Sequence, residues 1–375
     1  MNERNSQFGA PIPVLMGPTG SGKTAAAVAL ARDFPLTAIP ADLRQVMRGM
    51  EIGSAQPSAD ELSVLPHKLL GACDPKCDLT VHGWREMALG AIAEVVSEGR
   101  IPIIVGGSGL CVKSLAGGME YDAPAAPVLR PPLEAWVKGA GAAAVAPLVY
   151  KLIEGLIKPE SFFNPHRITR AIERYCYLHR SEIASPLGGI APPDVAAAAE
   201  RQVVEWNSYA NTIDREARPS GRVNADDNGS AENESNSGRA LKGALPGTRL
   251  VGTIEYKIFA LLPDRAWLAE RIHTRAKQMF ESGFIEEVRA LLAAGVPRDA
   301  RALLGHGYPE AIAVIDGKTS AAAAIERTAV ITRQYAKRQV TWLRHQLNDV
   351  TFLPVGPDCP PEEAVGQIRE WLLQH

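Results

Sequence analysis

The stretch GPTGSGKT, residues 17–24, constrains this chain more than any other feature. It fits the pattern G-x-x-x-x-G-K-[ST], in which backbone N–H groups and a lysine surround phosphate oxygens and the final hydroxyl is a ligand for Mg²⁺. The apolar PIPVLM before it predicts a buried strand, and the Ala-rich TAAAVALARDF after it predicts a helix whose N-terminus faces the anion. The sequence therefore predicts a site for a pyrophosphate-containing ligand, formed by Gly17, Thr19, Gly20, Ser21, Gly22, Lys23 and Thr24.

Residues 11–119 alternate short apolar runs with helical stretches. After the phosphate loop come LTAIPAD, HGWREMALGAIAEVVSEG and IPIIVGG. This alternation predicts an α/β fold, with a parallel sheet covered by helices. Ligands on such sheets bind at the carboxyl ends of the strands, so we expect three loops, GPTGSGKT, PADLRQV and GGSGL, to converge on one site.

The remainder of the chain has a different organisation. Residues 120–210 are Ala-rich segments broken by Pro and Gly, which predict a mainly helical insert. Residues 215–248 are rich in Ser, Asn, Gly and charge, and such a composition predicts a disordered loop. Residues 249–375 begin with a strand-like run and continue as helices, with a stop at Gly295. We expect them to complete the core that residues 11–119 begin.

Bulk composition leaves the partner open. The 40 Lys and Arg residues nearly balance 42 Asp and Glu residues, so any nucleic-acid site must be a local patch. The N-terminus lacks the basic start and apolar run of a signal peptide, and no apolar stretch approaches membrane-spanning length. These features predict a cytoplasmic protein without a membrane span. The five cysteines, an odd number without zinc-like spacing, are expected to be free thiols.

Two further segments suit the predicted site but leave their roles open. Asp42 follows an apolar strand, where it is equally consistent with a general base, a Mg²⁺ ligand or a helix N-cap. GGSG, residues 106–109, ends a strand without the acidic residue expected of an ATP hydrolase or an ordinary kinase. Its glycines suit close approach of the backbone to a ligand, or simply a tight turn.

Basic side chains recur at helical spacing in two segments. TRQYAKRQVTWLRHQ, residues 332–346, interleaves them with aromatic rings, and NPHRITRAIERY, residues 164–175, places arginines three or four residues apart. Such stripes track phosphates in nucleic-acid-binding proteins, although a solvated or salt-bridged surface has the same pattern. Arg271 and Arg275 also lie one helical turn apart and leave the same two alternatives.

Taken in order, these segments, together with ADLRQVMRGMEIGSAQP, LPHKLL, RIHTRAKQMFESGFIEEVRALLAAG and GHGYPEA, resemble the bacterial tRNA dimethylallyltransferases, over about residues 12–346. The resemblance implies a P-loop NTPase-like core with a helical insert. It also implies transfer of a dimethylallyl group from dimethylallyl diphosphate to N6 of the adenine just 3′ of a tRNA anticodon, position 37. The loop would then hold an isoprenoid diphosphate rather than ATP.

The resemblance also assigns roles to residues. Asp42 matches the family's general base and Arg275 an arginine at the diphosphate, while Mg²⁺ would bind near Thr24. These three residues are the expected catalytic groups. The positions that match tRNA contacts, with the basic C-terminal helix added, are Asp42, Leu43, Arg44, Gln45, Ser108, Arg130, His166, Arg167, Ile168, Thr169, Arg170, Arg333, Lys337 and Arg338.

The chain departs from the family pattern at several of these places. Leu43 replaces a serine, Met47 a tyrosine, Ser108 a threonine, Cys111 a tyrosine and Pro309 a lysine. An RNA-binding relative with weak or lost catalysis therefore stays open beside the active transferase, as does a small-molecule P-loop kinase. We expect a monomer that takes tRNA and dimethylallyl diphosphate as its partners.

Overall fold

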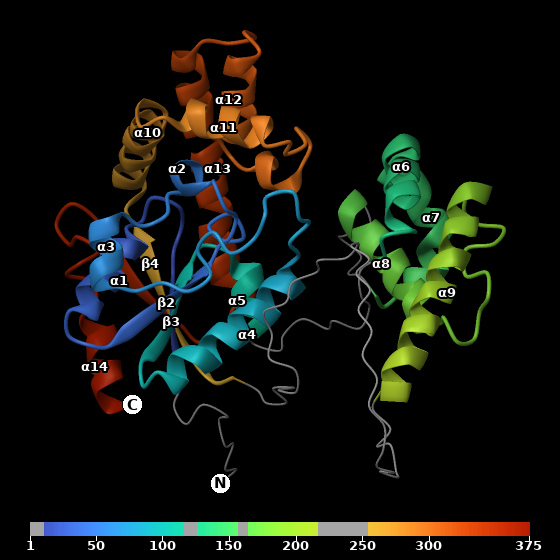
Figure 1. Ribbon diagram of the computed structural model, residues 1–375, viewed down its shortest axis with the longest axis horizontal. Helices are drawn as coiled ribbons and strands as arrows, with labels where there is room; N and C mark the ends of the chain where they lie inside the picture. Colours follow the sequence, from blue (N-terminus) through green and yellow to red (C-terminus); the bar gives the residue numbers. More distant parts are fainter. Residues whose placement is uncertain (1–10, 116–125, 157–163, 217–253) are drawn as a thin grey trace, which may run out of the picture. The chain divides into compact units, whose positions relative to one another are not determined.

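The structure is a computed structural model, and it describes residues 11–115, 126–156, 164–216 and 254–375 (Figure 1). The chain divides into two compact units: unit 1 comprises residues 1–119 and 239–375, and unit 2 comprises residues 120–238. The predicted disordered loop at 215–248 falls almost entirely outside the described residues, because only its first two residues are included, at the end of a helix.

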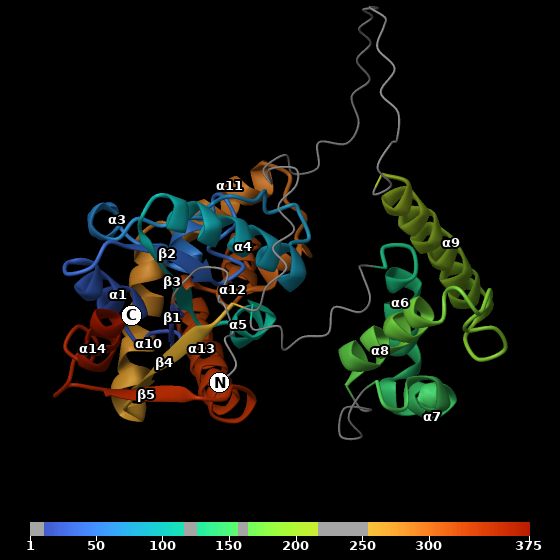
Figure 2. The ribbon, with the colours of Figure 1, turned by 90° about the horizontal axis from the view of Figure 1, so that it is seen from below.

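Unit 1 is built on a parallel sheet of five strands in the order β2-β3-β1-β4-β5. The alternation of apolar runs predicted the first four strands and the parallel sheet, and both predictions are confirmed. The short run VTFLPV was not predicted as a strand, yet it pairs with β4 at the edge of the sheet (Figure 2). The strands are β1 (Ile12–Met16), β2 (Leu36–Ala41), β3 (Ile101–Gly106), β4 (Tyr256–Pro263) and β5 (Val350–Val355).

The helices of unit 1 follow the strands and continue beyond them. The predicted long helical region after β4 is broken at Gly283, whose φ of 93° is left-handed, and the predicted stop at Gly295, with φ 82°, follows α11. The helices are α1 (Lys23–Ala31), α2 (Glu51–Ser54), α3 (Ala59–Val64), α4 (Val81–Ser97), α5 (Gly109–Leu115), α10 (Arg265–Glu281), α11 (Phe284–Ala293), α12 (Tyr308–Ile315), α13 (Ala321–Gln346) and α14 (Gly366–Gln374).

Helices cover both faces of this sheet, because alternate strand residues point to opposite sides (Figure 1). Met16 packs in a core with Trp84 of α4 and Cys111 of α5. Its neighbour Leu15 packs in a second core with α1 and with Ile368 of α14. Strands β1, β2 and β3 are therefore buried on both faces, as expected of a parallel sheet. A smaller apolar cluster joins α10 and α13, so these helices lie side by side.

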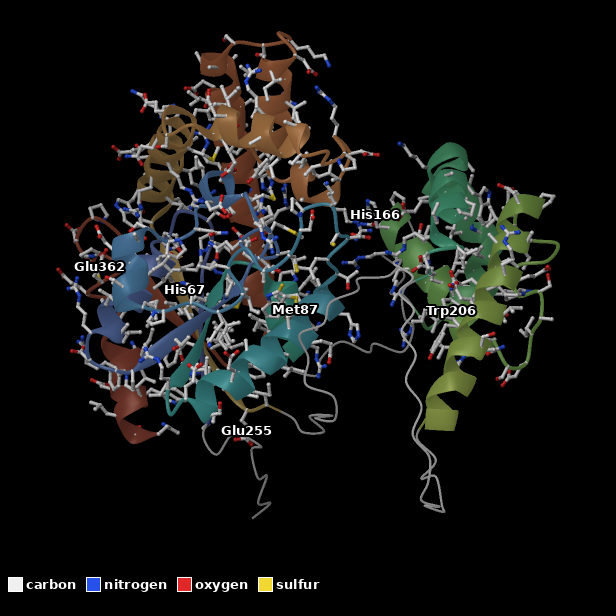
Figure 3. All side chains as sticks on the ribbon, viewed as in Figure 1. His67, Met87, His166, Trp206, Glu255 and Glu362 are labelled. Carbon is white, nitrogen blue, oxygen red and sulfur yellow. The ribbon has the colours of Figure 1, made fainter. Side chains whose placement is uncertain are left out.

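Unit 2 consists of helices over its described residues, in agreement with the predicted mainly helical insert. They are α6 (Arg130–Ala140), α7 (Ala142–Ile153), α8 (Pro165–Leu178) and α9 (Pro193–Glu216). Trp206 of α9 is buried in their shared core and meets the ring of Tyr177 edge to face at 5.2 Å (Figure 3). This unit has its own hydrophobic core.

Candidate functional site

The phosphate loop joins the end of β1 to the start of α1. Gly20 and Gly22 have φ values of 86° and 85°, in the left-handed region that glycine adopts without strain. Ser21 is fully buried, and its Oγ has no hydrogen-bond partner in the described parts of the chain. The first turn of α1 carries no acidic residue, so its backbone N–H groups and dipole are not neutralised by a side chain. The loop therefore has the geometry of an anion site.

Lys23 is the first residue of α1, and its side chain turns back over the loop. Its Nζ donates to the carbonyl oxygens of Gly17, at 3.0 Å, and Pro18, at 2.9 Å. Burial, reinforced by the positive charge of Arg275 and opposed by Asp42, lowers the pKa of Lys23 to about 8. A bound anion would remove much of this penalty, because an opposite charge favours the ammonium form.

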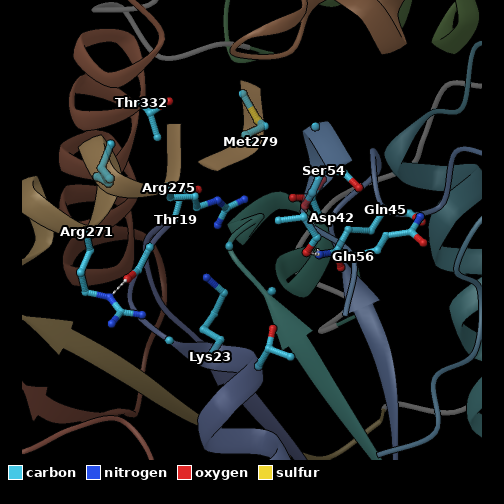
Figure 4. Close-up of a pocket in the computed structure, with 18 of the residues that line it drawn as sticks. Thr19, Lys23, Asp42, Gln45, Ser54, Gln56, Arg271, Arg275, Met279 and Thr332 are labelled. Atoms are coloured by element: carbon cyan, nitrogen blue, oxygen red, sulfur yellow. Dashed lines mark hydrogen bonds between the residues drawn. The ribbon is translucent and has the colours of Figure 1, made fainter. Parts of the chain in front are cut away.

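Arg275 of α10 supplies a second half-buried cation. Its guanidinium makes no hydrogen bond or ion pair with any residue that the structure describes. Burial and the neighbouring Arg44 lower its pKa, and Asp42 opposes them. One turn earlier, Arg271 donates to the carbonyl of Gly20 at 3.0 Å and so ties α10 to the phosphate loop (Figure 4).

Asp42 lies directly after β2 in a turn and does not begin a helix, so the N-cap alternative is excluded. Its Oδ1 accepts from the backbone N–H of Arg44 at 3.0 Å, and the Arg44 Nε lies 3.6 Å from the same oxygen. These contacts hold Oδ1, whereas Oδ2 makes no hydrogen bond with the residues that the structure describes. Asp42, Lys23 and Arg275 point toward one shared space from three separate elements (Figure 4).

That space is a pocket of about 730 Å³. Lys23, Arg275 and the phosphate loop line one part of it, which suits an anion. The carboxylate of Asp42 lines another part, which suits proton transfer. Thr19, Gly20, Gly22, Lys23 and Thr24 of the predicted phosphate-binding set line the pocket; Gly17 and Ser21 do not. The other polar side chains that line it include Asp42, Arg44, Gln45, Ser54, Gln56, Glu61, His67, Glu270, Arg271, Thr274, Arg275, Gln278, His306, Thr328, Thr332 and Gln339.

Glu287, a carboxylate that the sequence analysis did not single out, positions helix α2 at one side of the pocket. Glu287 of α11 accepts from the backbone N–H groups of Ile52, at 2.6 Å, and Gly53, at 3.1 Å, and from the hydroxyl of Tyr308 at 3.1 Å. Burial raises the pKa of Glu287, and these hydrogen bonds oppose the shift. Glu287 thereby fixes α2, which faces Gln45. No local pattern around Glu287 indicated this role.

The glycines of GGSG approach the protein's own atoms. A Cβ on Gly106 would lie 2.4 Å from the carbonyl oxygen of Ala41, and one on Gly109 would lie 1.9 Å from the ring of Trp342. These contacts account for the two glycines without a ligand, but Gly106 and Gly107 also line the pocket, so close approach of the backbone to a ligand stays a prediction. Ser108 does not line the pocket; its Oγ accepts from the N–H of Cys111 at the start of α5, at 3.4 Å.

Aromatic rings lie beside the basic groups at the pocket. The rings of His306 and Tyr335 are tilted against each other with centroids 4.5 Å apart, and the Arg338 guanidinium lies 5.8 Å from the Tyr335 ring. Burial and the charges of Arg44 and Arg338 lower the pKa of His306 to about 4, so its imidazole is neutral at pH 7. The sequence analysis did not identify His306 as a pocket residue, because the position of a single histidine in the sequence does not show which side chains surround it in space.

The structure distributes the expected RNA contacts unevenly. Arg333, Lys337 and Arg338 are exposed on α13, and Leu43 is half-buried against the core. In unit 2, His166 and Arg167 are exposed on α8. Two further expected contacts, Arg130 and Arg170, are engaged within unit 2. Arg130 donates two 2.6 Å hydrogen bonds to the fully buried Glu173, to which Arg170 also donates, at 3.0 Å.

Ile168 and Thr169 require a correction. Their side chains are buried in the core of unit 2, at 0% and 4% exposure, because α8 is amphipathic and these residues lie on its apolar side. We therefore do not propose them as RNA contacts.

The residues at the pocket fit a Mg²⁺ ion bound mainly through a ligand. Thr24 and Asp42 both line it, and the described residues contain no group of three or more His, Cys, Asp or Glu side chains that would form a metal cage. Mg²⁺ usually keeps several waters and binds through one or two protein oxygens plus phosphates. One hydroxyl and one carboxylate suit that coordination.

The sequence also led us to expect no membrane-spanning segment and no disulfide bonds. None of the helices in the described ranges is both long and apolar enough to cross a membrane. All five cysteines are free thiols, as expected.

Comparison with known proteins gives consistent matches. A family model described as IPP transferase matches residues 45–346, and one described as isopentenyl transferase matches residues 11–70. The tRNA dimethylallyltransferase of Thermus thermophilus is 31% identical, covering 97% of this chain and 98% of the relative, and that of Myxococcus xanthus is 32% identical, covering 93% and 97%.

Solved structures agree with these matches. The full-length tRNA isopentenylpyrophosphate transferase from Bacillus halodurans has a TM-score of 0.59 at 25% identity, covering 97% of this chain and 96% of that one. A eukaryotic dimethylallyltransferase acting on tRNA has the same fold, with a TM-score of 0.64 at 17% identity over 97% of this chain and 80% of that one.

Proposed function

Because the chain belongs to the IPP transferase family, we propose that it transfers a dimethylallyl group from dimethylallyl diphosphate to N6 of adenine 37, next to the anticodon of a tRNA. The observation that carries this proposal is the pocket that two half-buried cations, Lys23 and Arg275, line together with the carboxylate of Asp42. The reaction needs cationic groups that stabilise an anionic leaving group, and it needs a proton acceptor.

The pocket groups divide the chemistry between them. The bond between the allylic carbon and the diphosphate oxygen breaks, and a new bond forms from that carbon to N6 of adenine. The departing diphosphate gains negative charge, which Lys23, Arg275 and the N-terminus of α1 stabilise as preorganised donors. Mg²⁺ held at Thr24 would neutralise further phosphate charge. Asp42 accepts the proton that N6 loses, since an exocyclic amine is a weak nucleophile and benefits from a base.

The acceptor must reach this pocket from outside. A base leaves its stack at a cost of a few kcal/mol, which contacts in the extruded state must repay. Arg44, the His306–Tyr335 ring pair and Arg338 lie together beside the pocket and offer stacking and phosphate contacts. Arg333 and Lys337 on the same helix would follow the RNA backbone. We propose that the protein does this as a monomer in the cytoplasm.

Transfer of radiolabelled dimethylallyl to an anticodon stem-loop with adenine at position 37 tests the proposal. Asp42→Asn keeps an oxygen for the Arg44 N–H but removes the base, so we expect the rate to fall by about 10²–10⁴-fold, as for loss of a general base. Asp299→Ala, which changes an exposed aspartate outside the pocket, serves as the control and should retain the wild-type rate.

Other results would point elsewhere. Binding of the RNA without labelling by the wild-type protein would identify a relative that has lost catalysis. Turnover of ATP without labelling would identify a kinase. Equal rates for wild type and Asp42→Asn would refute the role of Asp42 as the base.

A further inference from the structure

One buried amide joins three parts of unit 1 that are distant in sequence. Gln339 of α13 is 7% exposed. Its Oε1 accepts from the backbone N–H of Thr19 in the phosphate loop at 2.9 Å. Its Nε2 donates to the carbonyl of Gly107, after β3, also at 2.9 Å. Both ends of the side chain are therefore used, each by a different loop.

These contacts need an amide at this position. The Thr19 N–H requires an acceptor and the Gly107 carbonyl requires a donor, and glutamine is the side chain of this length that supplies both. The fit is close, since a Cβ on Gly107 would lie 2.3 Å from the Gln339 Nε2. The conformation of the phosphate loop at Thr19 is thus set in part by the position of α13.

The same helix carries the proposed RNA contacts. Lys337 and Arg338 immediately precede Gln339 and are exposed, whereas Gln339 points inward. Three residues further on, Trp342 packs against Gly109, the first residue of α5. This is a second contact, beside that of Gln339 with Gly107, between α13 and the segment that follows β3. A shift or an ordering of α13 on binding RNA would therefore change the phosphate loop through Gln339.

We propose that Gln339 is a positioning residue that makes RNA binding along α13 and diphosphate binding in the loop cooperative. This inference rests on the proposed function, because it requires both ligands to bind. The coupling must be reciprocal: if RNA tightens the diphosphate site by some factor, diphosphate tightens the RNA site by the same factor. The inference concerns the link between the sites rather than either site alone.

The test measures the affinity for inorganic pyrophosphate, with Mg²⁺, in the presence and absence of a saturating anticodon stem-loop RNA. In the wild type we expect the RNA to tighten pyrophosphate binding by about fivefold or more, the lower end of typical allosteric coupling. In Gln339→Met, which keeps the volume but loses both hydrogen bonds, the ratio should fall to near one. Gln334→Met, an exposed glutamine on the same helix, is the matched control and should keep the wild-type ratio.

The outcomes separate the inference from the proposed function. A wild type that binds both ligands without coupling, or a Gln339→Met ratio equal to that of wild type, overturns the inference alone. A wild type that binds neither ligand overturns both proposals. A merely structural role for Gln339 would lower thermal stability without changing the ratio. Should Gln339→Met not fold, Gly107→Ala displaces the same amide from the other side and must also abolish the coupling.

Discussion

The pocket of unit 1 and the helical core of unit 2 accommodate partly buried positive charge in opposite ways. In unit 2, Arg130 and Arg170 both donate to Glu173, a carboxylate with no solvent exposure. In unit 1, Lys23 contacts only loop carbonyls, and Arg275 makes no hydrogen bond or ion pair among the described residues. The pKa values of both groups are lowered, chiefly by burial.

This difference distinguishes charged groups that stabilise the fold, such as those around Glu173, from charged groups that are available to a ligand, such as Lys23 and Arg275. A cation that is hydrogen-bonded to a buried carboxylate is already compensated, whereas a partly buried cation without such a partner costs stability and persists where a ligand compensates it. Sequence alone treated the arginines of both units as equivalent anion-binding candidates. Four substitutions test the distinction, in order of decreasing expected effect.

Arg275→Gln should cause the largest functional loss with no loss of stability. We expect kcat/KM for dimethylallyl transfer to fall by about 10²–10³-fold, the usual cost of removing one donor to a developing negative charge. The thermal midpoint should stay the same or rise, because a partly buried charge that has no hydrogen bond or ion pair among the described residues is removed. Steady-state kinetics and thermal unfolding measure the two effects. The exposed Arg289→Gln on α11 is the control, and a fall in stability for Arg275→Gln would contradict the comparison.

Glu173→Gln should show the opposite combination. Removing the buried negative charge leaves two guanidinium groups facing a neutral amide, and hydrogen bonds to charged groups contribute about 1.5–3 kcal/mol each. Both arginines keep some exposure, so we expect the free energy of unfolding to fall by about 2–3 kcal/mol rather than more. Urea unfolding measures it, with the exposed Glu134→Gln of α6 as the control. A loss below about 0.5 kcal/mol, within the range of ordinary surface changes, would show that this cluster is not structural.

Lys23 should make pyrophosphate binding depend on pH near 8. Below pH 8 the ammonium is charged and binds the anion; as the pH rises through its pKa of about 8 the free protein loses this charge, so affinity should fall by up to about tenfold per pH unit. In the same window stability should rise, because the unfolded chain still holds the proton that the folded chain has lost.

Binding measured from pH 7 to pH 9.5 tests this dependence. Lys23→Arg keeps the charge over the whole range, so it should bind with a flatter profile and reveals any titration of the pyrophosphate itself. An identical slope for the two proteins would rule out Lys23 as the titrating group.

Glu287→Gln should have the smallest effect and shows whether unit 1 also contains a structural carboxylate. One amide oxygen can still accept a hydrogen bond, but the NH₂ group would face a backbone N–H of Ile52 or Gly53. We expect a loss of about 1 kcal/mol in unfolding free energy, the typical worth of one hydrogen bond. Glu286→Gln, its exposed neighbour on α11, is the control. Equal stabilities would show that α2 is held by packing alone.

Local patterns in the sequence predicted the parts of the fold that depend on short segments. The phosphate loop, β1 to β4 and the helical insert follow from glycine spacing, apolar runs and composition. β5 was missed because it is short and most of its residues are not buried, so its strand conformation depends on pairing with β4. The break at Gly283 was missed because a single glycine inside a helical pattern is often tolerated.

The sequence by itself predicted a phosphate loop on a parallel α/β core, because the glycine spacing and the apolar and Ala-rich runs on either side of it are local features. The tertiary structure decided which charged groups are available to a ligand. Arg275 lines the same pocket as Lys23, although the two are 252 positions apart in the sequence. Arg170, which had the same helical spacing as Arg275, is instead hydrogen-bonded to Glu173. Whether a buried charge is compensated depends on its neighbours in space, and those neighbours are set by how distant segments pack.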